Sequence, residues 1–253
     1  IRASPTPSFS SPRSCRSERM TPRLEFRDVA KSFTMHLRDG IHLPVVAGLS
    51  FAVAPGECVV LGGPSGAGKS SILKMVFGNY AVDRGAILVA NDNSIVDVAV
   101  ASPREILAAR RTTIGYVSQF LRVVPRVGAL DVVAEPLVAA GHARDKAAER
   151  ARTLLRRLNL PERLWDLPPA TLSGGEQQRV NVARGFISGR PLMLLDEPTA
   201  SLDAVNRAVV INLIREAKAG GVSFLGIFHD EQVRDAVANR IVDVTRYAVP
   251  AAS

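Results

Sequence analysis

One glycine-rich stretch constrains the fold of this chain more than any other part of the sequence. Residues 63–70 read GPSGAGKS and fit the pattern G-x(4)-G-K-[ST], with an apolar β-type run at 59–61 before them and an apolar, helix-like run at 72–77 after them. Glycines let the backbone curl so that successive N–H groups point inward and form a nest for an anion at a helix N-terminus. This order predicts a phosphate-binding loop for a nucleoside triphosphate, with an ordinary glycine-rich turn as the alternative.

The residue types in this loop predict how it meets the phosphates. Lys69 is expected to reach the β- and γ-phosphates, and the Ser70 hydroxyl is expected to ligate Mg²⁺. Pro64 has no N–H group, so backbone donors are expected from Ser65 onward. The residues predicted to contact the nucleotide here are Gly63, Pro64, Ser65, Gly66, Ala67, Gly68, Lys69, Ser70 and Ser71.

Length and composition predict one globular unit with a smaller subdomain. The chain has 253 residues, and 47% of them are hydrophobic, which is ample for a core. No window approaches the roughly 18 apolar residues of a membrane span, and no stretch resembles a signal peptide, so we expect a cytoplasmic protein without direct membrane insertion. Cys15 lies in a polar segment and Cys58 before the phosphate loop, so neither a disulfide framework nor a metal cluster is predicted.

Residues 1–19 differ in composition from the rest of the chain. They are rich in Ser, Pro and Arg with almost no periodic apolar content, so we expect a disordered N-terminal extension, with Met20 as a sensible start. This segment holds four Arg and one Glu, a net charge of +3, which leaves +5 of the formal +8 for residues 20–253. Because that excess is small and no basic patch is interleaved with aromatics, no nucleic-acid partner is expected.

The N-terminal part of the globular region has the pattern of β-strands. Residues 24–33 and 46–53 alternate apolar and polar side chains, which predicts antiparallel strands with one buried face. Residues 86–98 predict a hairpin whose turn is at 91–94. Phe33 is a candidate for stacking on an adenine ring, with a core or surface aromatic as the alternative.

The pattern then changes from strand to helix. Residues 113–117 predict a strand that ends at Ser118 and Gln119, and residues 130–160 are helical in pattern. Within them, 143–158 has apolar residues at spacings of three and four, which predicts an amphipathic helix whose charges form a solvated face. Pro161 is expected to stop this helix.

Residues 172–179, LSGGEQQR, give the second strong signal. Their Ser-Gly-Gly turn is expected to open a helix at about 176–188, so that bare backbone N–H groups and a hydroxyl favour an anion there. Alone, this turn would be only a helix cap.

A third signal follows at residues 192–197, LMLLDE. This buried-strand pattern ends in two carboxylates at the edge where α/β proteins place their ligands. Asp196 is expected to hold Mg²⁺ through water, and Glu197 to orient or deprotonate the attacking water. The alternative is that the pair merely caps the following turn.

Together these motifs resemble those of the ATP-binding-cassette ATPases, over residues 22–245. Further matching features are Gln119 after a strand, Ser201-Leu-Asp203, and Phe228-His229-Asp230 after a strand at 222–227. The resemblance implies an α/β fold of the P-loop NTPase class, in which a mostly parallel sheet core carries an antiparallel β subdomain and a helical subdomain at about 125–185. It implies one nucleotide-binding domain over 20–253, ATP and Mg²⁺ as cofactors, and Mg-dependent ATP hydrolysis.

The resemblance also implies roles for single residues. Gln119 would sense the γ-phosphate, contact the metal ion and couple the site to a partner, and His229 would contact the γ-phosphate. A second cassette, either a copy or a companion subunit, would complete each site. The residues implied to serve that second site are Ser173, Gly174 and Gly175, with Asp203 lining the dimer seam.

Within that family, the finer resemblance is to the ATP-binding L subunit of the bacterial carbon-phosphorus lyase system, which breaks down phosphonates. It is carried by residues 117–126, 160–165, 176–187 and 226–231, and it implies the lyase complex as a partner. Residues 120–126 and the neighbourhood of Trp165 are expected beside partner-binding segments. The alternatives are the ATPase of a membrane exporter of the lipoprotein-release or macrolide-export type, and a cassette acting on ribosomes or DNA. The catalytic motifs do not separate these classes because all of them share the same site.

Overall fold

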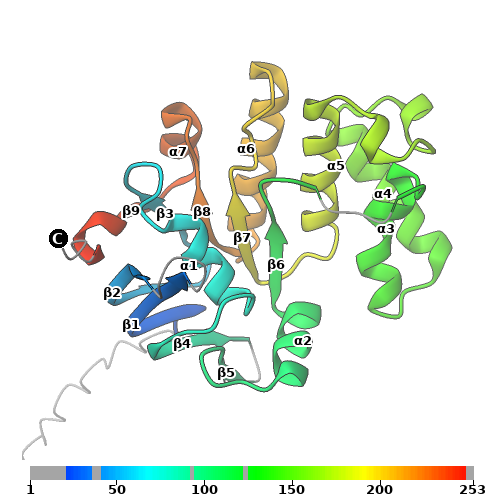
Figure 1. Ribbon diagram of the computed structural model, residues 1–253. Coiled ribbons are helices and arrows are strands. Elements are labelled where there is room, and N and C mark those ends of the chain that lie inside the picture. The colour runs from blue at the N-terminus through cyan, green and yellow to red at the C-terminus, as the bar shows by residue number, and fades with distance from the viewer. Residues whose placement is uncertain (1–20, 36–40, 92–93, 122–124, 249–253) are drawn as a thin grey trace, which may run out of the picture.

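The computed structural model describes residues 21–35, 41–91, 94–121 and 125–248, and the predicted extension at 1–19 lies outside this part. The described strands form two sheets, a four-stranded sheet in the order β2-β1-β4-β5 and a five-stranded sheet in the order β6-β7-β8-β3-β9. The smaller sheet and the helices α3 to α5 lie on opposite sides of the larger sheet (Figure 1). This arrangement is the predicted α/β fold with an antiparallel β part and a parallel core.

The antiparallel sheet confirms the strands expected from alternating side chains. Its strands are β1 (Leu24–Met35), β2 (Ile41–Val53), β4 (Arg84–Ala90) and β5 (Ile95–Asp97). β1 pairs antiparallel with both β2 and β4, and β4 pairs with β5 through the predicted hairpin. The Asn91 N–H closes the turn by donating to the Ser94 carbonyl.

The parallel sheet forms the centre of the molecule. Its strands are β3 (Cys58–Gly62), β6 (Ile114–Val117), β7 (Leu192–Asp196), β8 (Ser223–Ile227) and β9 (Arg240–Asp243). Every residue of β7 and β8 is buried, as expected for strands covered on both faces. The sequence patterns did not predict β9, a short edge strand whose first two residues are exposed.

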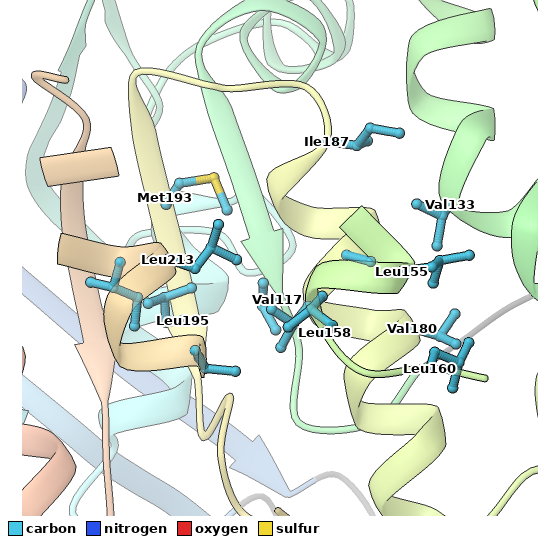
Figure 2. Close-up of a cluster of buried hydrophobic side chains, with 14 of the residues drawn as sticks. Val117, Val133, Leu155, Leu158, Leu160, Val180, Ile187, Met193, Leu195 and Leu213 are labelled. Atoms are coloured by element: carbon cyan, nitrogen blue, oxygen red, sulfur yellow. The ribbon is translucent and has the colours of Figure 1, made fainter. Parts of the chain in front are cut away.

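Each face of this sheet supports a separate hydrophobic core. On one face, Val59, Leu61 and Leu194 pack with the antiparallel sheet and α1 (Lys69–Val76). On the other face, Val60, Met193 and Leu195 pack with helices from α3 to α7 (Glu231–Val237), and Figure 2 shows part of this cluster. The alternation of side chains along a strand divides them between the two cores.

The helical part contains α3 (Ala129–Ala139), α4 (Arg144–Arg157) and α5 (Gly174–Phe186). Two short 3₁₀ helices, Glu162–Leu164 and Pro169–Thr171, connect α4 to α5. The continuous helical pattern predicted for 130–160 is broken after Ala139, where Gly141 has a φ of +91°. Gly174 opens α5 two residues earlier than predicted because Ser173 caps it.

The remaining helices complete the described chain. They are α2 (Pro103–Thr112), α6 (Ala204–Ala219) and the 3₁₀ helix Val244–Tyr247. Helix α2 was not predicted, although its capping box between Ser102 and Glu105 is a recognisable signal in the sequence. No helix within the described ranges has the length and apolar character needed to cross a membrane.

Candidate nucleotide-binding and hydrolysis site

The loop between β3 and α1 has the curled backbone expected of a phosphate-binding loop. Gly63, Gly66 and Gly68 have φ values of +125°, +82° and +90°. A Cβ atom on Gly68 would lie 2.4 Å from Cγ1 of Val45, so this position requires glycine for its conformation and for space. The Lys69 ammonium donates to the carbonyls of Gly63 and Pro64, each at 2.7 Å, and thereby spans the loop.

A cleft of about 210 Å³ joins this loop to the ends of two strands of the parallel sheet. Its floor comes from the loop and the start of α1, and its far wall comes from Glu197 after β7 and His229 after β8. The structure thus brings together residues that are more than 100 positions apart. The lining residues are Ser65, Gly66, Gly68, Lys69, Ser70, Ser71, Glu197, Ile227 and His229.

Asp196 lies beside the phosphate loop at the end of β7. Its side chain is buried, the Ser70 hydroxyl donates to its Oδ1 at 3.2 Å, and the Tyr116 hydroxyl donates to its Oδ2 at 3.3 Å. Burial raises the pKa of the Asp196 carboxyl, and the two hydroxyl donors oppose this effect. A buried carboxylate with a raised pKa gains most from a cation.

The oxygen donors of Asp196 and Ser70 fit Mg²⁺, which prefers oxygen ligands and is usually held by one or two protein groups together with phosphates and water. Among the described residues, no group of three or more His, Cys, Asp or Glu side chains is placed to hold a metal ion alone. A metal at this site would therefore need the nucleotide, and its role stays a prediction. Tyr116 was not predicted, because nothing in β6 itself indicates that this strand lies beside β7.

The raised pKa of Asp196 leads to an expected result for stability. When the pKa of a carboxyl is higher in the folded than in the unfolded state, the folded state loses stability as the pH rises from the lower to the higher of the two pKa values. We expect Asp196→Asn, which carries no charge, to melt at a higher temperature than the wild type at pH 7 without nucleotide. Its advantage should shrink as the pH falls toward 4, and Mg-dependent hydrolysis should be lost. Thermal melts between pH 4 and 8 measure this difference.

Asp243→Asn provides the matched control, because a hydrogen bond from the Thr245 hydroxyl lowers the pKa of Asp243. This variant should not gain stability at pH 7. An Asp196→Asn variant that melts below the wild type at every pH would contradict the interpretation of Asp196 as a buried carboxylate whose charge is unfavourable until a cation binds.

Glu197 and His229 contact each other on the far wall of the cleft. The His229 Nε2 atom lies 2.7 Å from Oε1 of Glu197. The Glu197 backbone has a φ of +53°, in the left-handed region, and its N–H donates to the Ile227 carbonyl at 3.0 Å. A carboxylate held by an imidazole beside a phosphate loop can orient and deprotonate a water molecule.

Four of the predicted site residues lie apart from this cleft. Ser173 caps α5 and donates to the Glu176 carboxylate at 2.7 Å, and Asp203 caps α6 by accepting from the Asn206 N–H. Neither they nor Gly174 and Gly175 are among the residues that line the cleft. The single chain therefore does not bring these residues to its own phosphate loop, and their roles stay predictions.

Gln119 and Phe33 also lie outside the lining of the cleft. Gln119 is exposed and follows β6, whose residue Val117 pairs with Leu195 just before the carboxylates. Phe33 is partly buried and meets the Tyr80 ring edge-on with centroids 5.1 Å apart, while Lys31 lies over its face. This environment leaves both interpretations of Phe33 open, and adenine stacking stays a prediction.

A phosphate loop in a parallel sheet, with carboxylates at the end of a neighbouring strand, defines a P-loop nucleoside triphosphatase. The family model described as ABC transporter matches residues 46–200. The chain therefore belongs to the ABC transporter family, and it has the fold of that family's ATP-binding, ATP-hydrolysing cassette.

Individual relatives agree with this assignment. The lipoprotein-releasing system ATP-binding protein LolD 2 of Caulobacter vibrioides is 39% identical over 213 residues, which cover 84% of this chain and 90% of that protein. The macrolide export ATP-binding/permease protein MacB of Marinobacter nauticus is 34% identical over 224 residues, which cover 88% of this chain and 34% of that protein. The chain also spans 61% of the length of the ABC transporter ATP-binding protein MT0079 of Mycobacterium tuberculosis, with 39% identity.

A solved structure has the same fold. The dimeric, post-hydrolysis state of the ATP-binding cassette MJ0796, bound to ADP and Pi, superimposes with a TM-score of 0.78 at 26% identity. The match covers 87% of this chain and 94% of that chain.

Proposed function

We propose that this chain is the ATPase subunit of an ABC exporter of the lipoprotein-release or macrolide-export type. The observation that carries the proposal is the match to LolD 2, which is 39% identical and is covered over 90% of its length. The match to MacB supports the same class. These relatives favour the exporter alternative from the sequence analysis over the carbon-phosphorus lyase interpretation, for which they give no support.

The proposed chemistry uses the residues around the cleft. Lys69 and the backbone N–H groups of the loop bind and neutralise the phosphates of ATP, and Ser70 and Asp196 would hold Mg²⁺. A metal ion held there would supply positive charge to offset the charge that develops on the phosphates. Glu197 takes the proton of the attacking water, and His229 holds the Glu197 carboxylate in place. Gln119, two residues beyond the end of β6, would sense the γ-phosphate of the bound nucleotide.

A second cassette would complete the site. The Ser173 turn is exposed and presents the N-terminus of α5, which favours an anion, but it does not line the cleft of its own chain. The structural similarity of this chain to the dimeric cassette MJ0796, which is bound to ADP and Pi, supports a dimer of cassettes. In that dimer, the Ser173 turn of each chain would face the phosphate loop of its partner. Asp203, exposed at the start of α6, would lie at the seam.

The helical part offers a surface for a transporter partner. A cavity of about 780 Å³ lies between α3, α4 and α5, and its apolar lining includes Val132, Val138 and Ala148. Phe120, next to Gln119, is 70% exposed. Trp165 is only 6% exposed and its indole N–H donates to the Leu160 carbonyl, so its own side chain belongs to the core. The expectation that its neighbourhood lies beside a partner-binding segment stays a prediction.

A membrane capture experiment tests the proposed role. A tagged Glu197→Gln chain, incubated with ATP in detergent-solubilised membranes of its source organism, should recover an integral membrane permease. Val138→Arg, which places a charge in the cavity between α3, α4 and α5, should reduce the recovery by about tenfold. Mass spectrometry of the recovered proteins provides the measurement.

Val100→Arg is the matched control, since Val100 is an 81% exposed valine outside the lining of that cavity. It should leave the recovery unchanged. Cells that lack the chain should grow normally with a phosphonate as the sole phosphorus source. Failure to grow on phosphonate, together with recovery of soluble lyase components and no permease, would reject the exporter in favour of the lyase.

A further inference from the structure

Two buried amide side chains on α5 reach the loops that carry Gln119 and Glu197. We propose that Gln178 and Asn181 are positioning residues, which fix these two loops relative to the helix that begins at the Ser173 turn. We call Gln178 and Asn181 the amide pair. Through this pair, the position of α5 would determine the orientation of the Glu197 carboxylate in the same chain. This inference rests on the catalytic role proposed for Glu197 and assigns a role to residues outside the predicted site.

The contacts of the amide pair are specific. Gln178 is 6% exposed, and its Nε2 donates to the Glu197 carbonyl at 3.3 Å. Asn181 is 4% exposed, and its Nδ2 donates to the Ser118 carbonyl at 2.5 Å. A buried amide is costly unless its hydrogen bonds are made, so each side chain is held to the one carbonyl that it reaches. Both carbonyls belong to residues that directly follow a strand of the parallel sheet.

The helix itself lies close against these strands. Gln178, Asn181 and Gly185 are spaced three and four residues apart, so they share one face of α5. A Cβ atom on Gly185 would come within 2.4 Å of Cγ2 of Val117, so glycine at this position allows α5 to approach β6. Because Val117 pairs with Leu195, the same face of α5 is placed beside the end of β7.

The backbone of Glu197 needs such support. Its left-handed conformation, with a φ of +53°, is unfavourable for a residue with a side chain and persists where the surroundings hold it. Its N–H is bound to the Ile227 carbonyl, and its own carbonyl accepts from Ala200 within the turn and from Gln178 across the helix interface. A shift of α5 would therefore act through Gln178 to rotate the backbone of Glu197. The Glu197 carboxylate, which contacts His229, would turn with it.

The test replaces Gln178 with methionine, which keeps the length of the side chain and removes the donor. Under single-turnover conditions, Gln178→Met should lower the hydrolysis rate by about 10- to 100-fold while nucleotide affinity stays unchanged. In a Glu197→Gln background, the same substitution should cause no further loss, because it acts through the Glu197 carboxylate. Asn181→Leu should likewise lower the rate, with no further loss in a Gln119→Ala background.

Val182→Ala is the matched control for a general loosening of α5, since Val182 is a fully buried residue of the same helix. It should lower the melting temperature and leave the hydrolysis rate within about twofold. If Gln178→Met does not fold, Gln178→Glu replaces it, and failure of both would show a role in folding and overturn the proposal. An unchanged rate, a parallel loss of nucleotide affinity, or an equal loss in the Glu197→Gln background would also overturn it. A Glu197→Gln variant with wild-type hydrolysis would instead reject the role of Glu197 itself.

Discussion

Replacing Glu197 with glutamine is expected to lower ATP hydrolysis by about 10²- to 10⁴-fold while ATP binding is retained. The substitution keeps the shape of the side chain and its contact with His229, but it removes the carboxylate that would take a proton from water. The phosphate loop, which supplies most of the lining of the cleft, is unchanged. Phosphate release and the binding of a fluorescent ATP analogue, measured on the same preparation, check both parts.

Lys69→Ala is the contrasting variant for this experiment. The Lys69 ammonium spans the loop through the Gly63 and Pro64 carbonyls and is the cation closest to the expected phosphates, so its removal should abolish nucleotide binding. If both variants lost nucleotide binding equally, Glu197 would be a binding residue and its role as a base would be wrong.

The second large effect is expected from mixing two inactive variants. Ser173→Arg blocks the turn that would face a partner's phosphate loop, and Lys69→Ala blocks the loop itself. In a mixed head-to-tail dimer, the intact loop of one chain meets the intact turn of the other, so one complete site remains. At equal amounts of the two chains, about one quarter of the wild-type sites should be intact, and activity should return to that level from near zero.

Each variant alone provides the control for this experiment, because a dimer of either one has no complete site. Mixed dimers are confirmed by two different affinity tags before hydrolysis is measured. Persistent inactivity in confirmed mixed dimers would mean that the Ser173 turn does not act on the partner's nucleotide.

The parts of the candidate site that could be predicted from the sequence are those whose motifs depend only on the local backbone conformation. The loop around Gly68, the capping turn at Ser173 and the carboxylates after β7 each combine a special conformation with a fixed residue type, so they can be recognised without knowing their neighbours. The parallel core and the antiparallel part were likewise predicted from strand patterns and the resemblance to the cassette family.

Contacts between distant segments could not be predicted in this way. Tyr116 meets Asp196 across 80 positions of the chain, and this pairing depends on β6 lying beside β7 in the sheet. The ion pair of Arg207 with Asp230, next to His229, depends in the same way on how α6 packs against α7. The catalytic motifs could not distinguish an exporter ATPase from a lyase subunit, because both classes contact ATP through the same residues.

The hydrogen bonds of Lys69 also affect the thermodynamics of nucleotide binding. Its ammonium already has two carbonyl partners in the loop, so the lysine exchanges partners when phosphate arrives and little chain has to be ordered. The conformational entropy that a flexible loop would lose on binding ATP is therefore already lost when the chain folds. Rapid capture of ATP would therefore need no prior rearrangement of this loop, and the slower steps of the cycle would fall to the meeting and separation of whole cassettes.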